Sequence, residues 1–325
     1  MRVAINGFGR IGRGFLRRAT EKGINVVAIN SLAGPDTFAY LLKFDSVYGK
    51  FNYPVNYGKN FLKVANKKIL CFNEREPRNL PWKKLDIDIV IEATGIFRDR
   101  EKAAAHIKAG AKRVVISAPS DNADITIVIG VNEKKLKKSH KVISMASCTT
   151  NCLAPVAKIL DDHFGITKGY MTTIHAYTNN QILLGDHHPK KRRGRAAAIN
   201  LIPTTSGATK AIEQVMPSLK GKLKGLAIRA PVPCGSLVDF VALLKKSTTK
   251  EELNKLFGRY AIGKMKGILG VTSEDYVSSD IIGDDRSSVV DTQLTEANGR
   301  MVKVFSWYDN EWGYSSRLVD LIKFL

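Results

Sequence analysis

The sequence is poor in acidic residues and in cysteine, and it has no long apolar run. Of 325 residues, 30 are Asp or Glu against 51 Lys or Arg, a formal net charge of +21. Four cysteines are too few for a disulfide scaffold, so we expect reduced thiols and a cytoplasmic protein. No stretch predicts a membrane span or a signal peptide. Repeats and low-complexity linkers are also lacking, and the length suits two domains.

The excess of basic residues suits anionic ligands such as a phosphorylated metabolite or cofactor. Incidental, non-specific binding of nucleic acid is also compatible with this charge. The densest basic segment, residues 190–195, lacks the interleaved aromatic side chains of a nucleic-acid site. The net charge alone therefore assigns no function.

The first 30 residues contain a dinucleotide-binding fingerprint. A short apolar strand at 3–6 leads into Gly7, Gly9 and Gly12 in the pattern G-x-G-x-x-G, followed by a predicted helix at 13–21 and a second strand at 24–30. Glycines at these positions let the backbone approach a pyrophosphate at the N-terminus of the helix. We therefore predict a dinucleotide site, with a mere tight turn as the alternative.

The second strand ends without the acid that commonly binds the adenosine ribose. Ser31 occupies that position, about 20 residues after Gly12. The missing carboxylate removes repulsion against a 2′-phosphate, to which the Ser31 hydroxyl can donate. This favours NADP, and an NAD enzyme that keeps its other contacts is the alternative. The first acid beyond it, Asp36, is expected to cap a helix at 37–44.

Alternating strand and helix patterns across residues 1–147 predict an α/β domain with a Rossmann-type, doubly wound parallel sheet. Long strands separated by turns across residues 148–312 predict an α+β catalytic domain with a mostly antiparallel sheet. Among the individual elements we expect a hairpin at 61–72, a helix at 100–109, a strand at 126–129, a helix opening at 203–208 and a final helix at 313–325.

Cys148 is the strongest candidate nucleophile. It follows an apolar strand pattern at 141–145 and precedes a helical pattern at 153–164. A helix N-terminus favours a thiolate, so we expect a lowered pKa for Cys148. Neighbouring hydroxyls at Ser147 and Thr149 could hold an anionic group. The alternative is an inert buried cysteine beside a helix cap. We expect Cys71 and Cys234 to be structural, and Cys152, one helical turn after Cys148, to pack rather than to act as a resolving thiol.

A thiolate nucleophile needs a base, and His175 at the end of an apolar strand is the best candidate. His106 lies among alanines and His187 and His188 lie in the basic loop, and no pair of histidines has metal-ligand spacing. A dinucleotide, a thiol and a base together indicate oxidation of an aldehyde through a thioester. Basic and hydroxyl-rich segments suggest that the substrate and the acceptor both carry phosphate; their residues are Ser147, Thr149, Thr178, Arg193, Ser206, Gly207 and Arg229.

These motifs occur together in one known family. Over essentially its whole length the chain resembles phosphorylating glyceraldehyde-3-phosphate dehydrogenases. The motifs that carry the resemblance are INGFGRIGR (5–13), SCTTNCLAP (147–155), HAYT (175–178), IPTT (202–205), RAPVP (229–233) and WYDNEWGYS (307–315).

The resemblance implies that Cys148 is the nucleophile and His175 the base. Thr178 and Arg229 would hold the phosphate of the substrate, while Ser147, Thr149, Arg193, Ser206 and Gly207 would hold inorganic phosphate. The cofactor, NADP or NAD, would be lined by Gly7, Gly9, Arg10, Ile11, Gly12, Ser31, Arg75, Thr94, Gly95, Ser117 and Asn310. It also implies a homotetramer, with residues 179–200 reaching a neighbouring subunit's cofactor and the last helix packing on the first domain.

Three departures from the family pattern concern the ligands. Ser31 and the segment 185–188, which includes His187 and His188, differ from NAD-specific members on the adenosine side. Asn180 replaces a common Asp. An erythrose-4-phosphate dehydrogenase with the same Cys and His is the alternative enzyme, and a binding role for the basic surface is the alternative outside catalysis. The direction of flux, glycolytic or biosynthetic, stays open.

Overall fold

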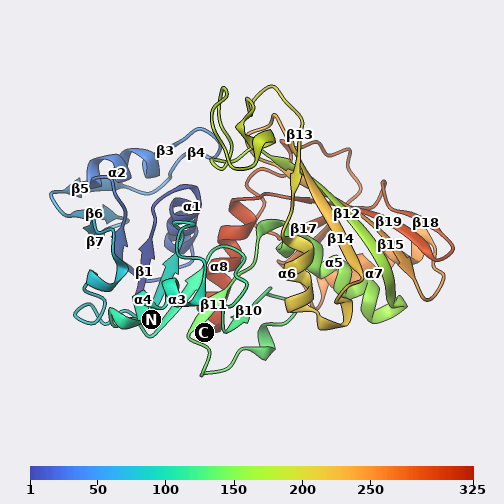
Figure 1. The fold of residues 1–325 in the computed structure, drawn as a ribbon, viewed down its shortest axis with the longest axis horizontal. Helices are drawn as coiled ribbons and strands as arrows, with labels where there is room; N and C mark the ends of the chain where they lie inside the picture. The colour runs from blue at the N-terminus through green and yellow to red at the C-terminus, as the bar shows by residue number, and fades with distance from the viewer. The chain divides into compact units, whose positions relative to one another are not determined.

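A computed structural model describes residues 1–325 and divides into two compact units. The first unit comprises Met1–Ile127, Lys134–Ala146 and Ser315–Leu325, and the second comprises Val128–Glu133 and Ser147–Tyr314. Figure 1 shows a sheet with flanking helices in each. None of the helices combines the length and the apolarity that crossing a bilayer requires.

The first unit is built on a nine-stranded sheet. In spatial order its strands are β10 (Ile125–Thr126), β11 (Val142–Ser144), β9 (Arg113–Ile116), β8 (Ile89–Glu92), β1 (Val3–Asn6), β2 (Val26–Asn30), β7 (Lys67–Phe72), β6 (Phe61–Val64) and β5 (Val55–Gly58). The strands from β10 to β7 pair in parallel, and the hairpin of β6 and β7 and its neighbour β5 add an antiparallel edge. The predicted doubly wound parallel sheet is confirmed.

The central parallel strands are short apolar runs because both faces of the sheet are covered. Every residue of β1 and β8 is buried. Residues such as Ala4, Val90 and Val114 form one core with Trp82, whose side chain is fully buried. The helices of this unit are α1 (Arg10–Glu21), α2 (Pro35–Lys43), α3 (Arg100–Ala103) and α4 (Ala105–Lys108), and a small ladder joins β3 (Phe44–Asp45) to β4 (Gly49–Lys50).

Three local predictions in this unit were wrong. Helix α2 begins at Pro35 with Gly34 as its N-cap, so Asp36 lies in the first turn and does not cap the helix. The predicted helix at 100–109 is divided at Ala104, whose ψ of −11° tightens the turn between α3 and α4. Of the strand expected at 126–129, only Thr126 lies in a strand, as the second residue of β10. The chain turns soon after it, where Val128 N donates to Asn132 Oδ1.

The second unit contains an eight-stranded, mostly antiparallel sheet, as predicted. Its path is β13 (Ile202–Thr205), β14 (Leu223–Ala230), β12 (Ile166–Ala176), β15 (Ser236–Leu244), β19 (Met301–Tyr308), β17 (Ser288–Asp291) and β16 (Leu269–Thr272), and β18 (Glu296–Asn298) pairs with β19. The pairs β12–β14 and β16–β17 are parallel. Residues 203–208 were expected to open a helix, but α6 begins only at Ala208. Pro203 lies in the edge strand β13, where its missing N–H is tolerated.

The helices of the second unit are α5 (Cys148–Phe164), α6 (Ala208–Val215) and α7 (Lys250–Ile262). Helix α5 packs on β15, β17 and β19. The opposite face of the sheet, formed by alternate residues that include Tyr170, Leu226, Leu243 and Met301, leaves these large apolar side chains exposed.

The chain ends with α8 (Trp312–Phe324), most of which belongs to the first unit. There Arg18 Nε of α1 donates to Ser316 Oγ over 2.9 Å. A side chain at Gly14 of α1 would collide with Ser315, so the two helices approach closely. Residues from the two ends of the sequence therefore complete the same unit.

Candidate active site

Cys148 is the first residue of α5, directly after the N-cap Ser147. The Ser147 hydroxyl accepts a hydrogen bond from Thr150 N over 3.0 Å, which explains why the helix begins here. The sequence prediction that Cys148 lies at the start of a helix is confirmed.

The side chains of His175 and Cys148 lie next to each other in the second unit. His175 is the penultimate residue of β12, is buried, and has its Nε2 at 3.4 Å from Cys148 Sγ. Its other nitrogen, Nδ1, lies 2.7 Å from Ala176 O, which can only accept. Nδ1 therefore carries the proton in the neutral ring, and Nε2 presents a lone pair to the thiol.

Arg229 lies beside this pair, because β14 and β12 place Arg229 opposite His175. Arg229 Nη1 is 3.0 Å from His175 Nδ1 and donates to Ala176 O at 3.0 Å and to Thr178 Oγ1 at 3.4 Å. Burial and then the Arg229 charge lower the pKa of His175 to about 3. The imidazole is therefore held neutral, as a base must be.

The expected lowering of the pKa of Cys148 was wrong. The side chain keeps some exposed surface, yet protein atoms surround the thiol closely enough that desolvation raises its pKa. Arg229 and hydrogen bonds from Thr149 lower the pKa but do not offset this effect. The site therefore pairs a neutral thiol with a neutral imidazole.

A second guanidinium, that of Arg193, lies in the same unit. It donates from Nε to Thr204 Oγ1 over 2.9 Å, from Nη2 to Thr205 O over 3.2 Å and from Nη1 to Asn180 Oδ1. Burial lowers the pKa of Arg193, and the charge of Arg229 lowers it further. No carboxylate pairs with Arg193 or Arg229, and the buried Nε of Arg229 has no partner. Such uncompensated cations are suited to an anionic ligand.

The remaining predicted phosphate residues lie at loop and helix ends in this unit. Thr149 is in the first turn of α5. Ser206 Oγ accepts from Ala208 N over 3.3 Å, and Gly207 is the N-cap of α6 with open space where a Cβ would stand. The open backbone at Gly207 thus stands at a helix N-terminus, a position that favours an anion.

Tyr308 is a site residue to which sequence reasoning assigned no role. Its hydroxyl is 2.9 Å from Thr149 Oγ1 and 2.8 Å from Thr173 Oγ1, and its ring meets His175 edge-on. Burial raises the pKa of Tyr308, so it stays a neutral phenol. Tyr308 thus connects the helix that carries Cys148 to the strand that carries His175.

The other three cysteines are free thiols that are buried or half-buried. Burial raises the pKa of Cys152 to about 12 and that of Cys71 to about 11. Cys234 is buried and contacts Asp309. No group of three or more acidic, histidine or cysteine side chains could hold a metal ion.

The fingerprint loop fits the pyrophosphate of a dinucleotide. Gly9 is the N-cap of α1, and a Cβ there would meet nothing within 4 Å, so the backbone is open to a ligand. A Cβ on Gly12 would instead collide with the carbonyl oxygen of Gly7, which explains the need for glycine there. Arg10 and Ile11 form the first turn, and Arg10 pairs with Asp45.

The other predicted cofactor residues of the first unit follow the carboxyl ends of parallel strands, where such sheets bind ligands. Ser31 follows β2, Thr94 and Gly95 follow β8, Ser117 follows β9, and the exposed Arg75 follows β7. Asn310 lies in the second unit, where its Oδ1 accepts from Ser236 Oγ over 2.9 Å. His187 is exposed and His188 is half-buried.

Comparison with known proteins identifies the family. The description "Glyceraldehyde 3-phosphate dehydrogenase, NAD binding domain" matches residues 1–100, and "Glyceraldehyde 3-phosphate dehydrogenase, C-terminal domain" matches residues 147–310. Glyceraldehyde-3-phosphate dehydrogenase 2 of Streptomyces avermitilis is 51% identical over 329 residues, covering 100% of this chain and 98% of the relative. The Geobacillus stearothermophilus glyceraldehyde-3-phosphate dehydrogenase is 52% identical over 328 residues, with the same coverage. The chain belongs to the glyceraldehyde-3-phosphate dehydrogenase family.

Proposed function

We propose that this chain oxidises glyceraldehyde 3-phosphate in the presence of inorganic phosphate to 1,3-bisphosphoglycerate, with NAD or NADP as cofactor. One observation carries the proposal: Cys148 and His175 face each other at 3.4 Å beside two guanidiniums that no carboxylate neutralises. A thiol and base pair supports covalent catalysis on a carbonyl, and the unpaired cations suit phosphate groups.

The first step follows from the neutral pair. His175 Nε2 takes the thiol proton while Cys148 Sγ attacks the aldehyde carbon, and the proton passes to the carbonyl oxygen to give a hemithioacetal. Arg229 stabilises the developing thiolate and orients the substrate's phosphate together with Thr178.

His175 then takes the hydroxyl proton of the hemithioacetal, and the carbonyl re-forms as a thioester on Cys148. The hydride that leaves the carbon in this oxidation would pass to the nicotinamide of a dinucleotide, whose pyrophosphate Gly7, Gly9 and Gly12 would hold. An oxygen of inorganic phosphate, held near Arg193, attacks the thioester carbon. The C–S bond breaks, the acyl phosphate leaves, and the sulfur recovers the proton from His175.

NADP is proposed as an accepted or preferred cofactor. Ser31, which follows β2 directly, presents no carboxylate to a 2′-phosphate, and Ser31 N donates to Phe72 O over 3.1 Å, which fixes the backbone there. The first acid after it, Asp36, is in α2.

We also propose that the protein is a homo-oligomer, consistent with a tetramer. The uncovered face of the second sheet supports this, because Tyr170, Leu226 and Met301 are exposed on it. Contiguous exposed apolar side chains are typical of interfaces between proteins. Light scattering of the purified protein tests the stoichiometry.

The test of the activity is reduction of NAD and of NADP with glyceraldehyde 3-phosphate, each with and without inorganic phosphate, and with Cys148→Ser as the control. We expect phosphate-dependent reduction of the cofactor by the wild type and none by Cys148→Ser. Reduction with erythrose 4-phosphate but not with glyceraldehyde 3-phosphate would favour the alternative enzyme. Absence of reduction with either aldehyde would contradict the proposal.

A further inference from the structure

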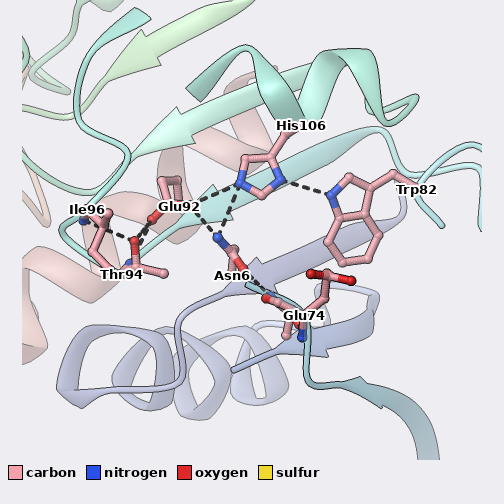
Figure 2. A network of polar contacts seen from close by, with 8 residues as sticks. Asn6, Glu74, Trp82, Glu92, Thr94, Ile96 and His106 are labelled. Carbon is pink, nitrogen blue, oxygen red and sulfur yellow. Dashed lines mark hydrogen bonds and ion pairs between the residues drawn. The ribbon is translucent and has the colours of Figure 1, made fainter. Parts of the chain in front are cut away.

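The first unit contains a buried polar network that the catalytic steps do not use. Asn30, Asn6 and Glu92 are the last residues of β2, β1 and β8, and the register of these strands places them side by side. All three are buried, as is His106 of α4. Figure 2 shows the side chains of Asn6 and His106 pointing toward Glu92.

Glu92 accepts four hydrogen bonds. Its Oε2 accepts from Asn6 Nδ2 over 2.6 Å and from His106 Nε2 over 3.0 Å. Its Oε1 accepts from Thr94 N over 2.8 Å and from the Thr94 hydroxyl. Each of the two carboxylate oxygens of Glu92 therefore accepts two hydrogen bonds, which fills its acceptor capacity.

The direction of these hydrogen bonds is fixed from both ends. On one side, the Trp82 indole N–H can only donate, and it does so to His106 Nδ1 over 3.0 Å. The neutral His106 ring then carries its proton on Nε2 and donates it to Glu92. The 3.3 Å approach of Asn6 Nδ2 to His106 Nε2 is then a contact between two donors.

On the other side, the backbone N–H of Glu74 donates to Asn30 Oδ1 over 2.9 Å, which sets the orientation of the Asn30 amide. Asn30 Nδ2 donates to Asn6 Oδ1 over 2.7 Å, so the Asn6 amide must donate to Glu92. The donors from both sides converge on Glu92, and the arrangement is fully satisfied by an ionised carboxylate. No Lys or Arg forms an ion pair with Glu92.

Glu92 acts on the segment that follows it. The carboxylate holds the backbone N–H and the hydroxyl of Thr94, and this hydroxyl accepts from Ile96 N over 3.1 Å. The same turn packs against the fingerprint loop: a Cβ on Gly7 would lie 2.6 Å from Thr94 N. An ordered turn at 93–95 therefore also defines one wall of the fingerprint loop.

We infer that Glu92 is a positioning residue for the dinucleotide: its buried anionic carboxylate holds the turn at Thr94 against Gly7, in the conformation that binds the cofactor. This inference rests on the proposed dinucleotide dependence. The crevice outside the carboxyl ends of parallel strands, where the strand order reverses between β1 and β8, is where such sheets bind dinucleotides. Glu92 and Asn6 end those two strands.

The test measures cofactor affinity separately from stability in the full-length protein. Calorimetric titration gives the Kd for NAD and NADP, and urea unfolding without cofactor gives the midpoint. Glu92→Gln keeps the shape but places an amide N–H₂ against donors, so we expect its Kd to rise at least tenfold. Trp82→Phe is the matched control, because it removes the outer donor and leaves all four contacts of Glu92. We expect a lower urea midpoint and a Kd within twofold of wild type.

If Glu92→Gln does not fold, two variants of His106 provide the same comparison. His106→Gln keeps a donor that can reach Glu92, whereas His106→Leu removes it, and both lose the Trp82 contact. We expect weak binding of NAD and NADP only for His106→Leu. A Kd within twofold of wild type for a folded Glu92→Gln, or equal weakening in Trp82→Phe, would overturn it. Wild-type protein that binds neither dinucleotide would refute the cofactor assignment itself, and the role of Glu92 with it.

Discussion

Arg229 Nη1 lies 3.0 Å from His175 Nδ1, on the adjacent and parallel strand. The Arg229 guanidinium therefore keeps a proton off His175 and also favours loss of the proton from Cys148. It lowers the pKa of His175 by disfavouring the imidazolium, and it lowers the pKa of Cys148 by favouring the thiolate. The base is kept unprotonated and the nucleophile is made easier to ionise by the same charge.

Replacing Arg229 by Leu should raise the pKa of Cys148 further, because the cation that favours the thiolate is lost. Iodoacetamide alkylation of Cys148, followed against pH, measures this shift. The same variant should lose about 10- to 100-fold in kcat/KM for glyceraldehyde 3-phosphate, the typical cost of losing charge-assisted hydrogen bonds. An alkylation profile identical to that of wild type would show that Arg229 does not act on the thiol.

Stability should depend on pH through His175. Its pKa is about 3 in the folded protein against an ordinary value of 6.5, so the unfolded chain binds a proton that the folded one excludes. This contribution is fully present above pH 6.5 and is lost as the pH falls toward 3. The free energy of unfolding should fall by up to about 1.4 kcal/mol per pH unit in this window.

His175→Asn lacks this titration, so its urea unfolding should depend less on pH between 6 and 4 than that of wild type. Subtracting the two stability curves removes the contribution of the other titrating groups. Parallel curves would mean that His175 is protonated in the folded protein.

The identity of residue 31 should decide the cofactor. Ser31→Asp places a carboxylate after β2, where it repels a 2′-phosphate and binds ribose hydroxyls. We expect the ratio of kcat/KM for NADP to that for NAD to fall about 10-fold or more, on the scale of one unfavourable charge contact. Ser31→Asn, similar in size but neutral, is the control. A ratio unchanged by Ser31→Asp would separate Ser31 from cofactor choice.

Asn180 should tune the affinity for inorganic phosphate. Its amide oxygen accepts from Arg193 Nη1 without neutralising the guanidinium. Asn180→Asp would form an ion pair there and reduce the positive charge offered to the anion. We expect the KM for inorganic phosphate to rise about tenfold, with the KM for the aldehyde changing less. Asn180→Ala, which removes the acceptor but adds no charge, should change the KM for phosphate less than Asn180→Asp does. Equal effects of the two variants would contradict the electrostatic explanation.

Features encoded in short segments could be predicted from the sequence. The fingerprint loop, the start of α5 at Cys148 and the strand that ends near His175 each depend on a few neighbouring residues. The two sheet types also follow from local patterns. Alternating strands and helices predict a parallel sheet, whereas successive strands separated by turns predict an antiparallel one.

Contacts that depend on how distant strands pair could not be predicted from these local patterns. Tyr308 contacts Thr149 across 159 positions of sequence, and Glu92 meets Asn6 because β1 and β8 pair in register. The pKa of Cys148 was mispredicted for the same reason. The helix N-terminus is a local feature, whereas the desolvation that outweighs it comes from the packing of distant segments around the sulfur.

The first unit combines segments that are far apart in the sequence, and this determines when it can be completed during translation. Ser316, the partner of Arg18, is translated 298 residues after it. The nine-stranded sheet can form early, but α8 joins it only after the whole second unit has been translated. The nascent first unit therefore exposes the α1 surface that α8 covers until α8 has been translated, and a stop codon placed just before α8 would leave that surface permanently uncovered.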